Sequence, residues 1–155
     1  MPGAAAHRGA PPGGHQDLAA AALSDRGGQD VGMAPKAVKL ATNVVHLRPD
    51  GTATVVPSRG GRHPDVEGRL VGEALMSKPA PHGGERHIDG DELLYLISGS
   101  VQVSLDHEDR EPQVIKLGPG DAFVVPQGTW HRVMPDEPSD LLFMTPGRNE
   151  VRPRR

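Results

Sequence analysis

Short apolar runs, divided by glycine, proline and aspartate, follow one another along the chain from Val38 onward. In Val101–Leu105 apolar and polar residues alternate strictly, which is typical of a strand with one buried face. Glu92–Ser98 is almost continuously apolar after its first residue. About ten short strands at this regular spacing predict an all-β sandwich or barrel. The other predicted strands are Val44–Leu47, Thr52–Val56, Leu70–Ser77, Gln113–Leu117, Ala122–Val125, Trp130–Met134 and Leu141–Thr145.

The two ends of the chain differ in composition from this strand-rich part. Residues 1–34 are rich in alanine, glycine and proline and lack strand periodicity, so we expect a disordered extension. We expect the barrel over residues 35–147, with its most informative part at residues 70–145. Residues 148–155 carry four arginines, which predicts a solvated basic tail.

The overall composition restricts the partners and ligands that we consider. With 155 residues the chain is long enough for one domain with a core. A net charge of −3, without a basic and aromatic stripe, argues against nucleic acid as a partner. No apolar run is long enough to span a membrane and no signal peptide is recognisable, so we expect a cytoplasmic protein. The lack of cysteine excludes thiolate ligands, so nitrogen and oxygen must hold any metal.

Two separate segments place ionisable side chains at the starts of predicted strands. Glu85 and His87 are two positions apart, so they lie on the same face of an extended chain. Glu92 begins a row of apolar residues that we expect to face the interior. A carboxylate in such a row is tolerable if it is neutral, paired or bound to a cation. His131 follows a glycine turn and is expected to face the interior as well, so these residues predict a buried metal site.

The spacing within these two segments resembles a known pair of motifs. The second segment follows the pattern Gly120-x5-Pro126-x-Gly128-x2-His131, and the first follows His87-x4-Glu92-x6-Gly99. At this separation, the two patterns resemble the two signatures of the cupin superfamily. The chain as a whole resembles a small single-domain member of that superfamily.

This resemblance implies a fold and a set of metal ligands. In cupins a double-stranded β-helix, or jelly-roll barrel, usually holds a divalent metal through three histidines and one glutamate. Carried over by position, His87, Glu92 and His131 match three of these ligands. The chain departs from the pattern with Glu85 in place of the first histidine, Pro79 in place of a glycine and Pro135 in place of an asparagine.

The fourth ligand stays open among several alternatives. Glu85 can bind the metal, or it can point away and leave a site of two histidines and one carboxylate, typical of non-haem Fe(II) chemistry. His82, in a glycine-flanked loop, can take its place, and Glu85 can instead be a solvent-facing partner of Arg86 or Lys78. Oxygen ligands favour Fe(II) or Mn(II), while Zn and Ni stay open.

A second apolar row lies on the face of Glu92–Ser98 opposite Glu92. Leu93, Tyr95 and Ile97 form this row, which either another strand, such as Val38–Leu47, or a second copy of the chain has to cover. Because cupins often pair through such sheets, we expect a homodimer.

The sequence supports two main hypotheses about function. One is a metal-dependent, dioxygenase-like oxidoreductase or Lewis-acid enzyme that acts on a small oxygen-bearing metabolite. In that enzyme Glu85, if it does not bind the metal, is placed to act as a general base. The alternative is a non-catalytic module that binds a small ligand or a metal. A purely structural barrel is the third hypothesis, because the fold alone does not choose among them.

Overall fold

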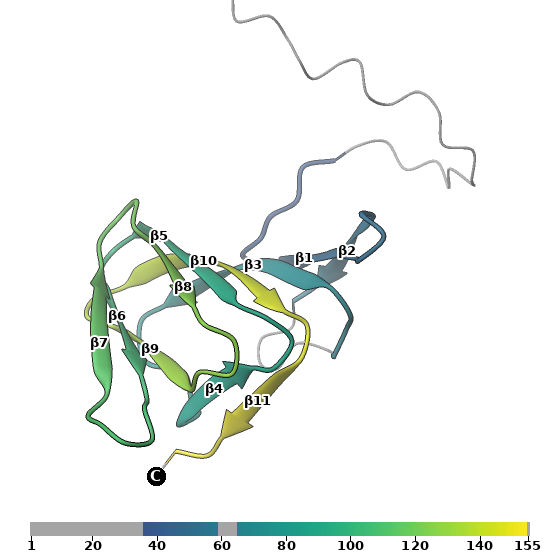
Figure 1. The fold of residues 1–155 in the computed structure, drawn as a ribbon. Helices are drawn as coiled ribbons and strands as arrows, with labels where there is room; N and C mark the ends of the chain where they lie inside the picture. The colour runs from purple at the N-terminus through teal and green to yellow at the C-terminus, as the bar shows by residue number, and fades with distance from the viewer. Residues whose placement is uncertain (1–35, 59–64, 155) are drawn as a thin grey trace, which may run out of the picture. The chain divides into compact units, whose positions relative to one another are not determined.

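The computed structural model describes residues 36–58 and 65–154, so the extension expected at residues 1–34 lies outside the described residues. The regular elements of the described part are β-strands (Figure 1). None of its segments is a helix long and apolar enough to cross a membrane. The strands are β1 (Asn43–Leu47), β2 (Ala53–Pro57), β3 (Arg69–Met76), β4 (Gly84–His87), β5 (Glu92–Ser98), β6 (Val101–Leu105), β7 (Gln113–Leu117), β8 (Ala122–Val125), β9 (His131–Pro135), β10 (Ser139–Pro146) and β11 (Asn149–Arg152).

The strands form two antiparallel sheets, which confirms the predicted all-β jelly-roll architecture (Figure 1). One sheet has the order β2-β1-β3-β10-β5-β8, and the other has the order β11-β4-β9-β6-β7. From β4 onward the chain passes repeatedly from one sheet to the other. Strands that carry the predicted site residues therefore come from both sheets.

The core lies between the sheets and is built by the alternation seen in the sequence. Leu94 and Leu96 of β5 are buried, whereas Tyr95 and Ile97 between and after them are 39% and 43% exposed. Glu92 begins this buried row, as the sequence predicts. The core cluster consists of Leu94, Leu96, Val101, Val103, Leu105, Leu117, Val125 and Leu141.

The turn from β5 to β6 requires the glycine that ends the first motif. Gly99 has a φ of +86°, a conformation that residues with a Cβ rarely adopt. A Cβ at this position would lie 2.3 Å from Oγ of Ser139 and 2.6 Å from the carbonyl oxygen of Pro138. Gly99 thus allows the chain to pass between the sheets against the start of β10.

The end of the chain differs from the expected solvated tail. Asn149–Arg152 forms β11, which pairs with β4 and is separated from β10 by only two residues. The guanidinium groups of Arg86 on β4 and Arg152 on β11 lie 5.0 and 4.9 Å from the ring centroid of Trp130. Arg152, which sequence composition assigns to a solvated tail, therefore helps to hold β11 against the barrel.

The N-terminal strands do not lie over the outer apolar row of β5, which is one of the two arrangements that the sequence left open. β1 and β2 continue the first sheet beside β3 and do not cover the row of Leu93, Tyr95 and Ile97. Tyr95 and Ile97 consequently remain exposed in the single chain.

Candidate metal centre

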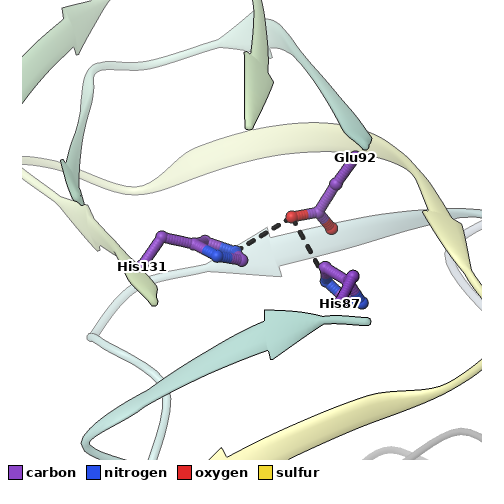
Figure 2. Close-up of side chains that lie close together, drawn as sticks. All are labelled: His87, Glu92 and His131. Atoms are coloured by element: carbon purple, nitrogen blue, oxygen red, sulfur yellow. Dashed lines mark ion pairs between the residues drawn. The ribbon is translucent and has the colours of Figure 1, made fainter. Parts of the chain in front are cut away.

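Three of the four predicted metal ligands meet between the sheets. His87 ends β4, Glu92 begins β5 and His131 begins β9. Their side chains are 4%, 6% and 1% exposed, and one ligand atom of each lies within 4.8 Å of the others. Figure 2 shows the two imidazole rings directed at the carboxylate of Glu92.

The distances within this group suit a metal ion. Oε2 of Glu92 lies 2.9 Å from Nε2 of His131 and 3.4 Å from Nε2 of His87 (Figure 2). Two ligands that each lie about 2.1 Å from an ion, at right angles, are about 3 Å apart. Two nitrogens and one oxygen at these separations match neighbouring positions around one divalent ion.

Two of the ligand atoms also lack another partner. Despite their separation of 2.9 Å, Oε2 of Glu92 and Nε2 of His131 do not have the alignment of a hydrogen bond. Within the described residues both are buried polar atoms without a hydrogen-bond partner. Such atoms are costly to bury, and a bound cation would satisfy both at once.

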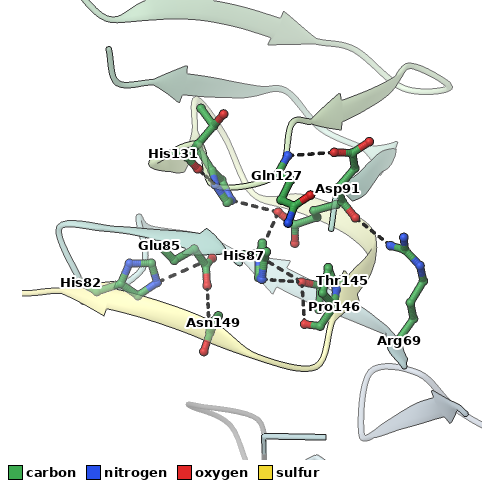
Figure 3. A network of polar contacts seen from close by, with 12 residues as sticks. Arg69, His82, Glu85, His87, Asp91, Gln127, His131, Thr145, Pro146 and Asn149 are labelled. Carbon is green, nitrogen blue, oxygen red and sulfur yellow. Dashed lines mark hydrogen bonds and ion pairs between the residues drawn. The ribbon is translucent and has the colours of Figure 1, made fainter. Parts of the chain in front are cut away.

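Neighbouring groups orient the two imidazole rings. Nδ1 of His131 lies 3.3 Å from the carbonyl oxygen of Thr129, which can accept a hydrogen bond from Nδ1–H and so leave the lone pair of Nε2 for a metal. The hydroxyl of Thr145 on β10 lies 3.0 Å from both ring nitrogens of His87 (Figure 3). Contacts of this kind fix the ring orientation of metal-bound histidines.

The electrostatics of the group favour a positive charge beside Glu92. Burial raises the pKa of the Glu92 carboxyl, but the contacts with His131 and His87 outweigh burial and lower this pKa from 4.5 to about 2. Burial lowers the pKa of His131, but Glu92 and, more weakly, Glu85 raise it above its ordinary value of 6.5. Without a metal, a proton on His131 supplies the positive charge.

Glu85 and His82 lie beside this group and outside it. Glu85 is opposite His131 in the pairing of β4 with β9. Its Oε2 accepts a hydrogen bond of 3.0 Å from Nδ2 of Asn149, and its Oε1 lies 4.0 Å from Nε2 of His82 (Figure 3). Arg86, considered above as a partner of Glu85, instead pairs with Glu150 at 2.6 Å.

Two acidic residues of the β4–β5 loop contact residues that are distant in sequence. Oδ1 of Asp91 accepts a hydrogen bond of 2.8 Å from the backbone N–H of Gln127 (Figure 3). The Gln127 side chain donates to the carbonyl of Ile88. Asp89 forms a two-pronged ion pair with Arg148, with distances of 2.5 and 2.6 Å. Both residues therefore join parts of the chain that are distant in sequence.

The three candidate ligands line a cavity of about 530 Å³. Glu85, His82, Thr145 and Asn149 line it as well. The rest of its wall is largely apolar and includes Leu70, Ala74, Met76, Leu94, Val133, Leu141, Phe143 and Val151. A site of this size, with few polar groups, suits a small organic molecule.

Sequence reasoning missed two residues of this cavity. Thr145 carried a signal, because it continues the alternation of Leu141 and Phe143 and is thus a polar residue at an inward position. The sequence pattern gives no such signal for Asn149, because this residue lies in the segment that composition predicts to be a solvated tail.

Comparison with protein families and solved structures gives one family match. Residues 76–145 match the model of the family described as "Cupin domain". No curated protein matches the chain significantly. Among solved structures, a cupin-2 domain containing protein from Shewanella frigidimarina NCIMB 400 is 23% identical, with 50% of this chain and 70% of that chain covered and a TM-score of 0.43.

Two further structures are enzymes that the chain matches only in part. An oxalate decarboxylase is 19% identical, with 54% of this chain and 23% of that chain covered and a TM-score of 0.45. Hydroxypropylphosphonic acid epoxidase from S. wedmorenis is 17% identical, with 50% and 42% covered and a TM-score of 0.41. The family match, with the two sheets and the paired motifs, shows that residues 76–145 of this chain form a cupin domain.

Proposed function

We propose that this protein binds one divalent metal ion through His87, Glu92 and His131 and acts there on a small oxygen-bearing metabolite. The observation that carries the proposal is a pair of buried ligand atoms, Oε2 of Glu92 and Nε2 of His131, which lie 2.9 Å apart and lack a hydrogen-bond partner. Buried polar atoms in proteins rarely lack a hydrogen-bond partner, and a bound ion is one of the groups that supplies it. The proposed chemistry is dioxygenase-like or that of a Lewis acid.

The ligand set favours Fe(II) or Mn(II). Two imidazoles and one carboxylate with open positions form the arrangement that is typical of non-haem Fe(II) enzymes. When bound, such an ion supplies Lewis acidity, and Fe(II) also supplies electrons for dioxygen chemistry.

The residues around the ligands have separate tasks in this proposal. Thr145 and the carbonyl of Thr129 hold the imidazole rings in place. The apolar wall excludes water from the bound molecule. Glu85 lies beside the ligand group, where Oε1 can accept a proton from a hydroxyl or amine of the bound molecule.

Oxygen uptake under defined metal loading tests the proposal. The chain is loaded with Fe(II) without oxygen and then mixed with oxygen and pooled small alcohols, amines and carbonyl compounds. We expect a pool that consumes oxygen with the wild type and not with His131→Gln. Tight binding of a pool component without turnover would instead indicate a binding module.

We also propose that two copies of the chain pair through the outer face of the first sheet. Leu93 lies opposite Val124 and Tyr95 lies opposite Ala122 in the pairing of β5 with β8, so these side chains share one face. Tyr95, Ile97 and Val124 are 39%, 43% and 50% exposed. Light scattering should give the mass of a dimer for the wild type and of a monomer for Ile97→Lys. A monomeric wild type would contradict the proposal.

A further inference from the structure

The cavity that the candidate ligands line also holds a separate set of polar side chains. These side chains are more exposed to solvent than the ligands are. The side chains of His82 and Glu85 are 23% and 28% exposed, whereas that of Glu92 is 6% exposed. Asn149 joins them along the same wall (Figure 3). We call His82, Glu85 and Asn149 the outer polar group.

The pairing of β11 with β4 explains how this group is built. Asn149 lies opposite His87 and Val151 lies opposite Glu85, so the inward positions of both strands line the cavity. From its place diagonal to Glu85, Asn149 donates to Oε2. This bond holds the carboxylate of Glu85 beside the cavity and away from the group of three ligands.

The other oxygen of Glu85 retains the capacity to accept a hydrogen bond. Its Oε1 lies 4.0 Å from Nε2 of His82, which is too long for a hydrogen bond. A carboxylate oxygen has two lone pairs and offers no proton when ionised. Oε1 is therefore a place for a hydrogen-bond donor of a bound molecule.

The described residues that line the cavity include two glutamates and no lysine or arginine. The two arginines of the cavity-forming strands β4 and β11 are directed to the opposite face, where Arg86 and Arg152 pack on Trp130. Arg86 also pairs with Glu150, and Arg152 pairs with Asp106. Neither guanidinium is placed to bind an anion in the cavity.

The charge of the cavity thus discriminates among ligands. A carboxylate or phosphate beside Glu85 meets a like charge without a neighbouring arginine or lysine to offset it. A hydroxyl or amine meets an acceptor, and the largely apolar wall receives a hydrocarbon body.

We propose that the cavity selects small molecules that combine a compact apolar body with a neutral or cationic hydrogen-bond donor, bound by Glu85. Alcohols and amines belong to this class, and carboxylates and phosphates of the same size do not. The inference rests on the proposed function in that the selected molecule lies beside the proposed ion. A bound divalent ion attracts anions itself, so the part of the selectivity that comes from Glu85 is measured as its change in Glu85→Gln.

The test compares three molecules with the same six-carbon body: hexylamine, 1-hexanol and hexanoate. Each is titrated by calorimetry into the full chain as purified, and the metal content is measured on the same sample. We expect hexylamine to bind at least about tenfold more tightly than hexanoate, with hexanol between them. In Glu85→Gln the preference should fall to within about threefold, because the carboxylate charge is gone.

Two further variants keep the test decisive. Glu150→Gln removes the same charge from the outward face of β11, so it should retain the wild-type preference. Val151→Lys places a cation opposite Glu85, on an edge strand where Val151 is 44% exposed. This variant should bind hexylamine more weakly and hexanoate more tightly than the wild type does.

Three outcomes separate this inference from the proposed function. Hexanoate that binds as tightly as hexylamine to the wild type, or an unchanged preference in both Glu85→Gln and Val151→Lys, would overturn the inference. A metal-loaded chain whose preference is unchanged by Glu85→Gln and by Val151→Lys would leave the metal proposal standing and contradict this inference. A chain that shows the preference but stays metal-free after reconstitution would support this inference and count against the proposed function.

Discussion

The carboxylate of Asp91 accepts a hydrogen bond of 2.8 Å from the backbone N–H of Gln127, which lies 36 residues further along the chain. Asp91 immediately precedes Glu92, and Gln127 lies in the loop that leads to His131. The backbone N–H of Gly128 donates to the carbonyl of His87 in the same region, at 2.8 Å. These bonds fasten together the two loops that carry the candidate ligands.

Asp91→Ala should therefore weaken the site without removing a ligand. Loss of one charge-assisted hydrogen bond at an exposed position is expected to cost about 1 kcal/mol of the free energy of unfolding. Metal affinity should fall about tenfold, because groups that orient ligands contribute on this scale. Urea unfolding and Mn(II) titration of the purified chain measure the two effects.

The control for this variant is Asp109→Ala, in the turn between β6 and β7 and away from both loops. It should leave Mn(II) affinity unchanged. Equal affinities of the wild type and Asp91→Ala would show that the bond between Asp91 and Gln127 does not position the site.

Thr145→Val should lower metal affinity by about tenfold or more while the fold is kept. The substitution preserves the shape of the side chain and removes the hydroxyl that contacts His87. Thr145→Ser keeps the hydroxyl, so it should recover most of the affinity. Zn(II) titration of the three proteins checks this, and a Thr145→Val protein with wild-type affinity would contradict the positioning role.

In the metal-free protein, the contribution of His131 and Glu92 to the free energy of unfolding should depend on pH. Since the pKa of His131 is raised, its stabilising effect is full below 6.5 and is lost as pH rises through the folded-state value. Since the pKa of Glu92 is lowered to about 2, its effect is full above 4.5 and is lost as pH falls toward 2. Both effects are present between pH 4.5 and 6.5.

His131→Gln should consequently cost more stability near pH 5.5, inside that window, than near pH 8.5, above it, in urea unfolding with a chelator present. Metal affinity of the wild type should change in the opposite direction and rise with pH, because a metal needs the neutral imidazole. A stability difference between wild type and variant that is the same at both pH values would contradict the proposed charge pair.

The contact of Trp130 with Arg86 and Arg152 gives a direct report on β11. Trp130 is the single tryptophan of the chain, so its fluorescence is specific to this place. Arg152→Ala removes the guanidinium over the ring and its ion pair with Asp106. We expect a red-shifted emission and a loss of about 0.5–1 kcal/mol of stability.

Arg154→Ala removes a neighbouring charge that lies beyond β11, and it should leave the emission unchanged. The amide of Gly83, which donates to the carbonyl of Arg152, should also exchange its hydrogen faster in Arg152→Ala. An unaltered spectrum in Arg152→Ala would show that this contact does not hold the strand.

The sequence predicts most of the barrel because its strands have a strong local pattern. Glu92–Ser98, Val101–Leu105 and Gln113–Leu117 are strands with the predicted bounds. Their period of two is a local signal, because residues two positions apart lie on the same face of a strand. β11 escaped prediction because it is short and charged, and it is held by Trp130 and by its pairing with β4, which are distant in sequence.

The same distinction applies to the candidate site. His87, Glu92 and His131 could be found from motif spacing, and the structure brings them together. The partners of Glu85 could not be found, because Asn149 reaches it only through the register between β4 and β11. The bond from Gln127 to Asp91 likewise depends on how two loops meet, which local patterns do not encode.

Metal content is the most direct test of the central claim. Untagged protein is purified without chelator, and its metals are measured by elemental analysis beside His131→Gln and the control His107→Gln, which alters a turn histidine between β6 and β7. We predict about one iron or manganese ion per chain in the wild type and the control, and almost none in His131→Gln. Metal far below one ion per chain in all three proteins, not restored by reconstitution of the wild type, would contradict the account.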